Sequence, residues 1–231
     1  MKVLIVTPAK NEGLNLNVLF QSLISQNSNV ICRWIIVNDS STDNTEEIVQ
    51  TFRAHFPILL VNTKSSGKLI TGGAYQAWMH GLRNIDTYRN EITHVMKLDA
   101  DIRLYPDYFS QLQQKCKATG TLGGKDCQKK LNIPWHVPGA VKMYSLEAFD
   151  LVKNFPLSPG FDVLDDIACR NSNLPVEVCP DAKFEYLRNV GVSEGLLHGI
   201  FRRGYVCKIT GYNPIYFGLI ALKESFRFPF I

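Results

Sequence analysis

The feature that most constrains this fold is the alternation of short apolar runs with segments of helical periodicity before residue 101. KVLIVT is a continuous apolar run of the kind that forms a strand buried on both faces, and WIIVND, PILLVN and ITHVMKL resemble it. Leu16, Leu19 and Leu23 recur at helical spacing, and SSTDNTEEIVQTF and residues 73–82 predict further helices. This order predicts an α/β fold with a Rossmann-like, mostly parallel sheet flanked by helices.

The pattern becomes less regular in the second half of the chain. It predicts one strand, at 137–145, helices at 106–114, 146–153, 192–203 and 214–224, and a loop at 160–170 that leads into a short helix. No internal repeat, low-complexity tract or flexible linker interrupts the sequence. The 231 residues, 45% of them hydrophobic, can bury a sizeable core. We therefore predict a single domain spanning residues 1–231.

The overall charge and the cysteines exclude several classes of protein. The net charge of +4 is too small and too dispersed to indicate nucleic-acid binding. Six cysteines without a CxxC pair argue against a disulfide framework or a zinc knuckle, and fit the reduced cysteines of a cytoplasmic protein. No stretch approaches the roughly 18 apolar residues of a membrane span.

Polar side chains follow each of the four predicted strands. The strands lead into TPAKNE, NDSSTD, NTKSSGK and DAD, and the carboxyl ends of strands in an open α/β sheet lie where ligands bind. Carboxylates there can bind a divalent cation or hydrogen-bond a base and a ribose, while Lys64 and Lys68 can meet a diphosphate. The combination predicts a nucleoside-diphosphate pocket with a metal ion at its mouth.

Simpler interpretations compete with parts of this prediction. Asp99 and Asp101 could be solvated turn residues, and Lys64 with Lys68 could form a solvated basic loop. Asp43 is better explained as the cap of the helix that follows it than as a ligand. Ligand binding is favoured because all four strand ends are polar together.

Four segments, VTPAKNEGLNL, VNDSSTDNT, KLDAD and GFDVLDDIACR, stand in the order and spacing of motifs in family-two glycosyltransferases with the GT-A fold. The chain resembles that family over nearly its whole length. The second segment departs from the family's V-D-D-G-S-T-D, because Asn38 replaces the first acid and Ser40 the glycine. The resemblance implies a donor-binding half at 1–101 and an acceptor-side half, with a helical tail, at 102–231.

The resemblance also implies a reaction, the inverting transfer of a sugar from a nucleoside-diphosphate sugar to a hydroxyl acceptor in polysaccharide, glycolipid or glycoconjugate synthesis. The Q-x-x-R-W motif of processive polymerases is absent, which favours transfer of a single sugar. Two alternatives stay open. One is a catalytically inactive nucleotide-sugar-binding module, and the other is a sugar nucleotidyltransferase, although TPAKNEGLN lacks the glycine- and arginine-rich signature expected there.

The resemblance implies a nucleoside site formed by four residues after the first two strands: Pro8, Ala9, Glu12 and Asp39. Asp39 would hydrogen-bond the base, usually uracil or guanine, so the expected donors carry UDP or GDP.

The segment Asp99, Ala100 and Asp101 matches the family's D-x-D, whose carboxylates bind the ribose and a Mn²⁺ or Mg²⁺ ion on the diphosphate. His198 is a weaker candidate as a further metal ligand, and a helix-surface or capping role competes with it.

The acceptor side requires a base, which this family takes from an acidic pair at the start of a late helix. Asp165 and Asp166 match that pair. Adjacent helical residues point about 100° apart, so one of them is expected to face the sugar, with Asp165 favoured. Trp135 and His136 are candidates for contact with the acceptor.

The C-terminal segment YNPIYFGLIALKESFRFPFI is apolar, aromatic and sparsely basic. It could be an interfacial segment that holds the protein at the inner face of the cell membrane, near a lipid-linked acceptor. A terminal helix packed on the core or at a dimer interface explains the same composition.

Overall fold

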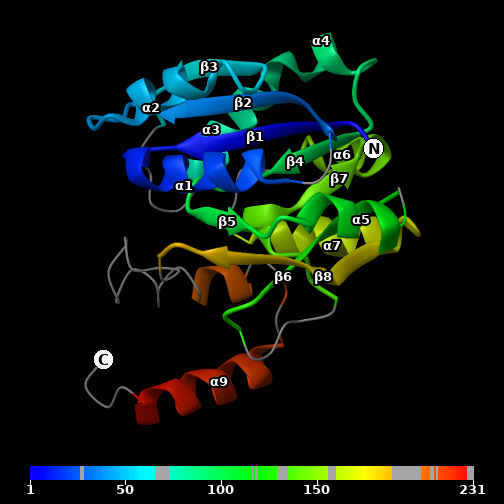
Figure 1. The fold of residues 1–231 in the computed structure, drawn as a ribbon. Helices are drawn as coiled ribbons and strands as arrows, with labels where there is room; N and C mark the ends of the chain where they lie inside the picture. The colour runs from blue at the N-terminus through cyan, green and yellow to red at the C-terminus, as the bar shows by residue number, and fades with distance from the viewer. Residues whose placement is uncertain are drawn as a thin grey trace.

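The computed structural model describes residues 1–26, 29–65, 73–115, 117, 119–129, 135–155, 160–188, 204–208, 211 and 213–227. The strands among these residues form one mixed sheet, in the order β3-β2-β1-β4-β7-β6-β8-β5 (Figure 1). The strands are β1 Val3–Ala9, β2 Ile31–Asp39, β3 Ile58–Thr63, β4 His94–Lys97, β5 Ile102–Leu104, β6 Thr121–Asp126, β7 Met143–Ser145 and β8 Val176–Tyr186.

The first four strands are parallel, as the sequence predicts. β1 lies between β2 and β4 and β3 pairs with β2, so the carboxyl ends of all four strands share one edge. β1 is buried along its whole length, which explains why its sequence is continuously apolar rather than alternating. The α/β fold class is confirmed.

Helices cover both faces of the sheet. On one face lie α1 Gly13–Ile24, α2 Thr45–Phe52 and α5 Tyr108–Lys115, where Phe20 stacks on Phe52 with ring centroids 4.1 Å apart. On the other lie α3 Gly73–Gly81, α4 Ile85–Tyr88, α6 Leu146–Val152 and α7 Phe161–Asn171, around a second apolar cluster that includes Trp78 and Tyr144. Apolar packing therefore covers the sheet on both faces and fixes the positions of its strand ends.

Two local predictions are wrong in detail. Asp43 does not cap α2, because the helix begins at Thr45 with Asn44 at the cap position. Asp43 instead joins two helix starts, accepting hydrogen bonds from the backbone N–H groups of Thr45 and Gly13, both at 3.1 Å. The strand predicted at 137–145 is reduced to β7, because its first part forms the 3₁₀ turn η2, Gly139–Val141.

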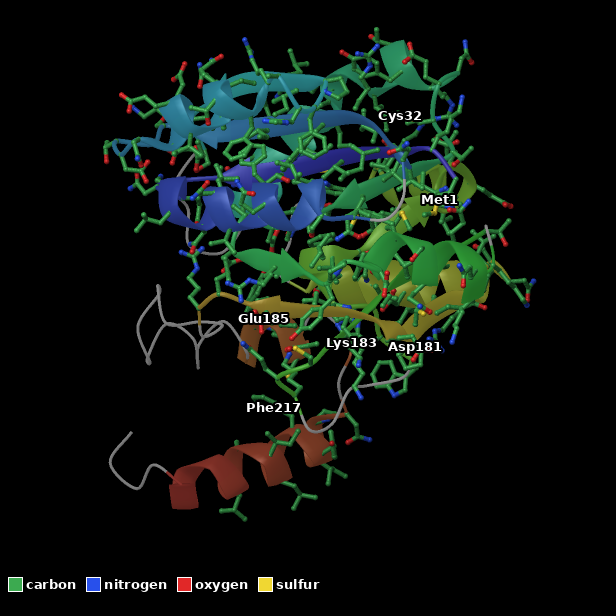
Figure 2. All side chains as sticks on the ribbon, viewed as in Figure 1. Met1, Cys32, Asp181, Lys183, Glu185 and Phe217 are labelled. Atoms are coloured by element: carbon green, nitrogen blue, oxygen red, sulfur yellow. The ribbon has the colours of Figure 1, made fainter. Side chains whose placement is uncertain are left out.

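The second half of the sheet reverses direction. β7 runs antiparallel to both β4 and β6, and β8 runs parallel to β6. Asp181, Lys183 and Glu185, labelled in Figure 2, alternate along β8 with the buried Ala182 and Phe184, so β8 turns one face to the core and the other outward.

The C-terminal helix α9, Pro214–Arg227, overlaps the helix predicted at 214–224 and lies apart from the sheet (Figure 1). Its large apolar side chains are exposed at four positions: Ile215, Tyr216, Leu219 and Leu222. Within the described part of the chain, none of the helices has the length and apolar character needed to span a membrane. The helix predicted at 192–203 lies outside the described residues, as do the predicted ligands Lys68 and His198.

Candidate active site

The carboxyl ends of the parallel strands carry the residues predicted to line the nucleoside site. Pro8 and Ala9 end β1 in buried positions, and Glu12 is buried immediately before α1. The Glu12 carboxylate accepts a hydrogen bond from Asn15 Nδ2 at 2.7 Å and pairs with Arg188. Burial raises the pKa of Glu12, while Asn15 and Arg188 act to lower it.

Asp39 ends β2, and its carboxylate anchors the segment that follows β3. It accepts hydrogen bonds from the Ser65 backbone N–H and the Ser65 hydroxyl, both at 2.6 Å, while Lys10 Nζ lies 3.6 Å from its Oδ2 atom. Lys64 is exposed and directly precedes Ser65, so this predicted diphosphate ligand lies one residue from the contact with Asp39. The ends of β2 and β3 are therefore joined at the proposed base-binding position.

The two D-x-D aspartates follow β4 directly, on either side of the buried Ala100. Each of them faces a cation from the same chain. Lys97 Nζ pairs with Asp99, and Arg188 Nε donates to Asp101 Oδ2 at 2.7 Å. Because Arg188 also pairs with the carboxylate before α1, it links the end of β1 to the end of β4.

The 3₁₀ turn η2 lies against the D-x-D segment. Asp99 N–H donates to Ala140 O at 2.9 Å, and Lys97 Nζ donates to Gly139 O at 3.2 Å. A Cβ atom at Gly139 would lie 2.9 Å from Asp162 Oδ2, so the carboxylate of Asp162 packs directly over this glycine. Asp162 belongs to the first turn of α7. The start of α7 and the D-x-D segment thus border the same space.

The predicted catalytic pair, Asp165 and Asp166, lies in the interior, around the amino group of Lys142. Lys142 Nζ donates to Asp165 Oδ1 at 2.8 Å and to Asp166 Oδ1 at 2.9 Å. The Tyr144 hydroxyl donates to Asp165 Oδ2 at 2.5 Å. The side chains of Lys142 and Asp165 are 0% exposed and that of Asp166 is 3% exposed. The structure brings the pair together, with both carboxylates engaged by donors of the protein.

Charge balance explains how this cluster tolerates burial. Burial raises the pKa of Asp165, and Lys142 opposes that rise. Burial also acts to lower the pKa of Lys142, but the carboxylates of Asp165 and Asp166 outweigh it, so that the pKa is raised. An unpaired charge in the same place would be strongly unfavourable.

The acceptor-side candidates Trp135 and His136 lie beside α7. Trp135 is half exposed, and its carbonyl oxygen accepts a hydrogen bond from Arg170 at 2.5 Å. His136 Nδ1 lies 2.8 Å from Asp166 Oδ2, so it contacts the buried pair directly.

Comparisons with known proteins agree with this arrangement. The sequence model of the family described as Glycosyl transferase family 2 matches residues 4–126, more than half of the chain. The chain belongs to this family. The matched region contains the first three motifs and ends before α7. A search of curated protein sequences gives no match.

Solved structures similar to this glycosyl transferase share its GT-A fold. TarS 1-349 of S. aureus in complex with UDP-GlcNAc superimposes with a TM-score of 0.62 at 18% identity, over 85% of this chain and 62% of TarS 1-349. The mannosyltransferase PcManGT of Pyrobaculum calidifontis, in complex with GDP-Man and Mn²⁺, superimposes with a TM-score of 0.61 at 18% identity, over 82% of this chain and 58% of PcManGT. The matched region therefore covers about three fifths of TarS 1-349 and of PcManGT, and 36% of the longer TarS chain.

The donor atoms of the glycosyl transferase fit a divalent cation in part. Among the described residues, no group of three or more His, Cys, Asp or Glu side chains could hold a metal ion. Asp99 and Asp101 nevertheless offer hard carboxylate oxygens at the strand end, and a cation such as Mg²⁺ commonly binds one or two carboxylates and completes its shell with phosphate oxygens and water. The two aspartates suit a cation that arrives with a diphosphate.

Sequence reasoning missed three cations of the site: Lys97, Lys142 and Arg188. Lys97 and Lys142 are both buried, and each lies within an apolar stretch of the sequence. A lysine in such a stretch is the sequence signal that could have indicated a buried ion pair. Arg188 carried no comparable signal, because its two partners lie 87 and 176 residues away in the sequence.

Arg188→Gln is expected to tighten Mn²⁺ binding to the nucleotide-free protein by about fivefold, because an exposed ion pair of about 1 kcal/mol no longer competes with the metal for Asp101. Titration of free Mn²⁺ by electron paramagnetic resonance measures this change. Arg188→Lys keeps the competing charge and should stay closer to wild type. Equal affinity in Arg188→Gln and wild type would show that Arg188 does not compete with the metal.

Proposed function

We propose that this glycosyl transferase moves a single sugar, with inversion, from a UDP- or GDP-linked donor to a hydroxyl acceptor, assisted by Mn²⁺ or Mg²⁺. The observation that carries the proposal is the meeting of the D-x-D aspartates and the start of α7 around η2. The presence of UDP-GlcNAc in TarS, and of GDP-Man with Mn²⁺ in PcManGT, supports a nucleotide-sugar donor and a divalent ion.

The residues of the strand ends would divide donor binding between them. Asp39 would accept hydrogen bonds from the base, with Pro8, Ala9 and Glu12 lining the nucleoside site. Lys64 and Lys68 would offset the charge of the diphosphate. A divalent ion on Asp99 and Asp101, with His198 as a weaker further ligand, would supply charge stabilisation for the departing diphosphate.

The acceptor would enter from the side of α7. Its hydroxyl oxygen attacks the anomeric carbon from the face opposite the diphosphate, which inverts the configuration at that carbon. The hydroxyl proton must pass to a group of the protein. The Asp165–Asp166 pair is proposed to support this proton transfer, either directly or through a side chain that it holds in place.

The exposed apolar side chains of α9 support contact with a membrane surface, where a lipid-linked acceptor of polysaccharide or glycolipid synthesis would be carried. In this proposal the protein works in the cytoplasm, at the inner face of the membrane.

The test of the function is release of nucleoside diphosphate from a panel of UDP- and GDP-sugars, with Mn²⁺ or Mg²⁺ and with water or added sugars as acceptors. Turnover should appear with one nucleotide class and should fall in Asp166→Asn, while that nucleotide still binds. Sedimentation of the same preparations with anionic phospholipid vesicles tests the contact through α9. Absence of turnover across the panel would contradict the proposal.

An inactive nucleotide-sugar-binding module is the second candidate. The full burial of Asp165 against Lys142 favours it, because a buried ion cluster is also what a purely structural role would produce. Nucleotide binding without turnover in the same panel would select this alternative.

A further inference from the structure

His136 is held in one orientation by a buried carboxylate. Its Nδ1 atom lies 2.8 Å from Asp166 Oδ2, and the Val137 N–H donates to the same oxygen at 3.2 Å. Lys142 Nζ donates to the other oxygen of Asp166 at 2.9 Å. Since Asp166 accepts from every one of these neighbours, the hydrogen of the imidazole must sit on Nδ1. The Nε2 atom of neutral His136 is left with a free lone pair.

The free nitrogen lies beside the carboxylate of Asp162. His136 Nε2 lies 3.9 Å from Asp162 Oδ2, beyond hydrogen-bonding distance but close enough for one oxygen atom to contact both. The side chains of His136 and Asp162 are 19% and 32% exposed, so both are accessible. Asp162 packs over Gly139, whose carbonyl oxygen accepts from the lysine that pairs with Asp99.

The pKa of Tyr186 is raised by burial and by carboxylates from both sides of the site. Burial is the largest cause of the raised pKa of its phenol. The negative charges of four carboxylates raise this pKa further, those of Asp99, Asp126, Asp101 and Asp162. The α7 carboxylate and the D-x-D carboxylates therefore act on the same point.

The buried carboxylates are placed to hold His136 rather than to meet an acceptor. Lys142 Nζ donates to one oxygen of each carboxylate, and the other oxygen of Asp166 contacts His136 Nδ1. Asp165 and Asp166 themselves lack the exposure that contact with an acceptor requires.

We propose that His136, oriented by Asp166, takes the proton of the acceptor hydroxyl in the transfer reaction. The acceptor oxygen bonds to the anomeric carbon, the bond from that carbon to the diphosphate oxygen breaks with its electron pair, and the hydroxyl proton moves to Nε2. Asp162 holds the hydroxyl beside Nε2 and stabilises the imidazolium. Asp166 is a positioning residue that acts through His136. This inference rests on the proposed function.

The test compares His136→Gln with His55→Gln, which makes the same change at an exposed turn after α2. Both proteins are titrated with UDP and GDP in the presence of Mn²⁺ and assayed for donor turnover as a function of pH. His136→Gln should bind nucleotide like wild type but lose about 10²- to 10⁴-fold in turnover, the usual contribution of a general base. His55→Gln should match wild type in both measurements.

The pH profile separates proton transfer from a structural role. Wild-type turnover should fall as the pH is lowered, because an Nε2 atom that already carries a proton cannot accept another. His136→Gln should lose this acidic limb. Among the described residues, Asp166 and Asp162 face His136. Lys142 contacts the far oxygen of Asp166, and Arg170 donates to the Trp135 carbonyl. Asp162→Asn should keep the acidic limb of the pH profile.

A nuclear magnetic resonance measurement gives a second, activity-independent outcome. The ¹⁵N spectrum should show His136 with Nδ1 protonated and Nε2 unprotonated, the signal being assigned by its loss in His136→Gln. An Nε2–H tautomer, or turnover of His136→Gln within about threefold of wild type, would overturn the inference while nucleotide binding persists. Failure of the proposed function appears differently, as wild-type protein that gives no turnover with any donor of the panel, and it would overturn both.

Discussion

Replacing Lys142 with methionine is expected to lower the free energy of unfolding by about 3–5 kcal/mol, the cost of removing one partner from a buried ion pair. Lys142 is fully buried, and its amino group is bonded to both Asp165 and Asp166. Methionine fills much of the same volume but leaves the carboxylates without a cation, so the loss reports charge rather than packing. Urea denaturation at pH 7, followed by circular dichroism, measures the change.

The pH dependence of this loss has a defined sign. Burial raises the pKa of Asp165, and removal of Lys142 takes away the main opposing influence. Near the pKa of Asp165 the folded variant then binds more protons than the unfolded chain. Its free energy of unfolding is therefore higher at low pH, where Asp165 is neutral, and falls as the pH rises. The deficit should therefore be smaller at pH 5 than at pH 7.

Lys115→Met is the matched control, because Lys115 pairs with Asp181 on the surface. Its denaturation midpoint should stay near that of wild type. Equal midpoints for Lys142→Met and Lys115→Met would contradict the role assigned to the buried cluster.

The sequence was sufficient to predict the parallel half of the fold. The strands β1 to β4 are short apolar runs separated by helical periodicity, and β1 and β4 are buried along their whole length, whereas the edge strand β3 is mostly half-buried. Because parallel strands end at a common edge, the sequence order alone brings Asp39 and Asp99 to the same side of the sheet.

The packing of α7 could not be predicted in the same way. Its buried positions include Asp165 and Asp166, whereas Ile167 is largely exposed, so the polar residues face inward. This orientation depends on Lys142, which lies on a separate segment and compensates the two carboxylates only after folding. Hydrophobic periodicity cannot predict such a pairing, because it assigns every charged residue to the surface of a helix.

The largest expected effect on ligand binding comes from Asp99→Ala/Asp101→Ala. Both carboxylates lie just after β4, and they are the acidic ligands proposed for the divalent ion. Removal of both should reduce nucleotide affinity in the presence of Mn²⁺ by at least about 100-fold, or roughly 3 kcal/mol. The lysine and arginine side chains of the site would then offset the diphosphate charge without a divalent ion.

Asp86→Ala/Asp181→Ala is the control for the change in net charge, because it removes two exposed carboxylates that belong to α4 and β8 and not to the proposed site. It should bind nucleotide and metal like wild type. Circular dichroism of both double variants should match wild type, which shows that a loss of binding is not a loss of fold.

The most direct measurement is calorimetric titration of the wild-type protein and the two double variants with UDP and with GDP, each with and without Mn²⁺. The account predicts that wild type and Asp86→Ala/Asp181→Ala bind one nucleotide in a Mn²⁺-dependent manner, and that Asp99→Ala/Asp101→Ala does not. Folded wild-type protein that binds neither nucleotide, or equal Mn²⁺-dependent binding in Asp99→Ala/Asp101→Ala, would contradict the central claim that this strand end holds the diphosphate of a sugar donor.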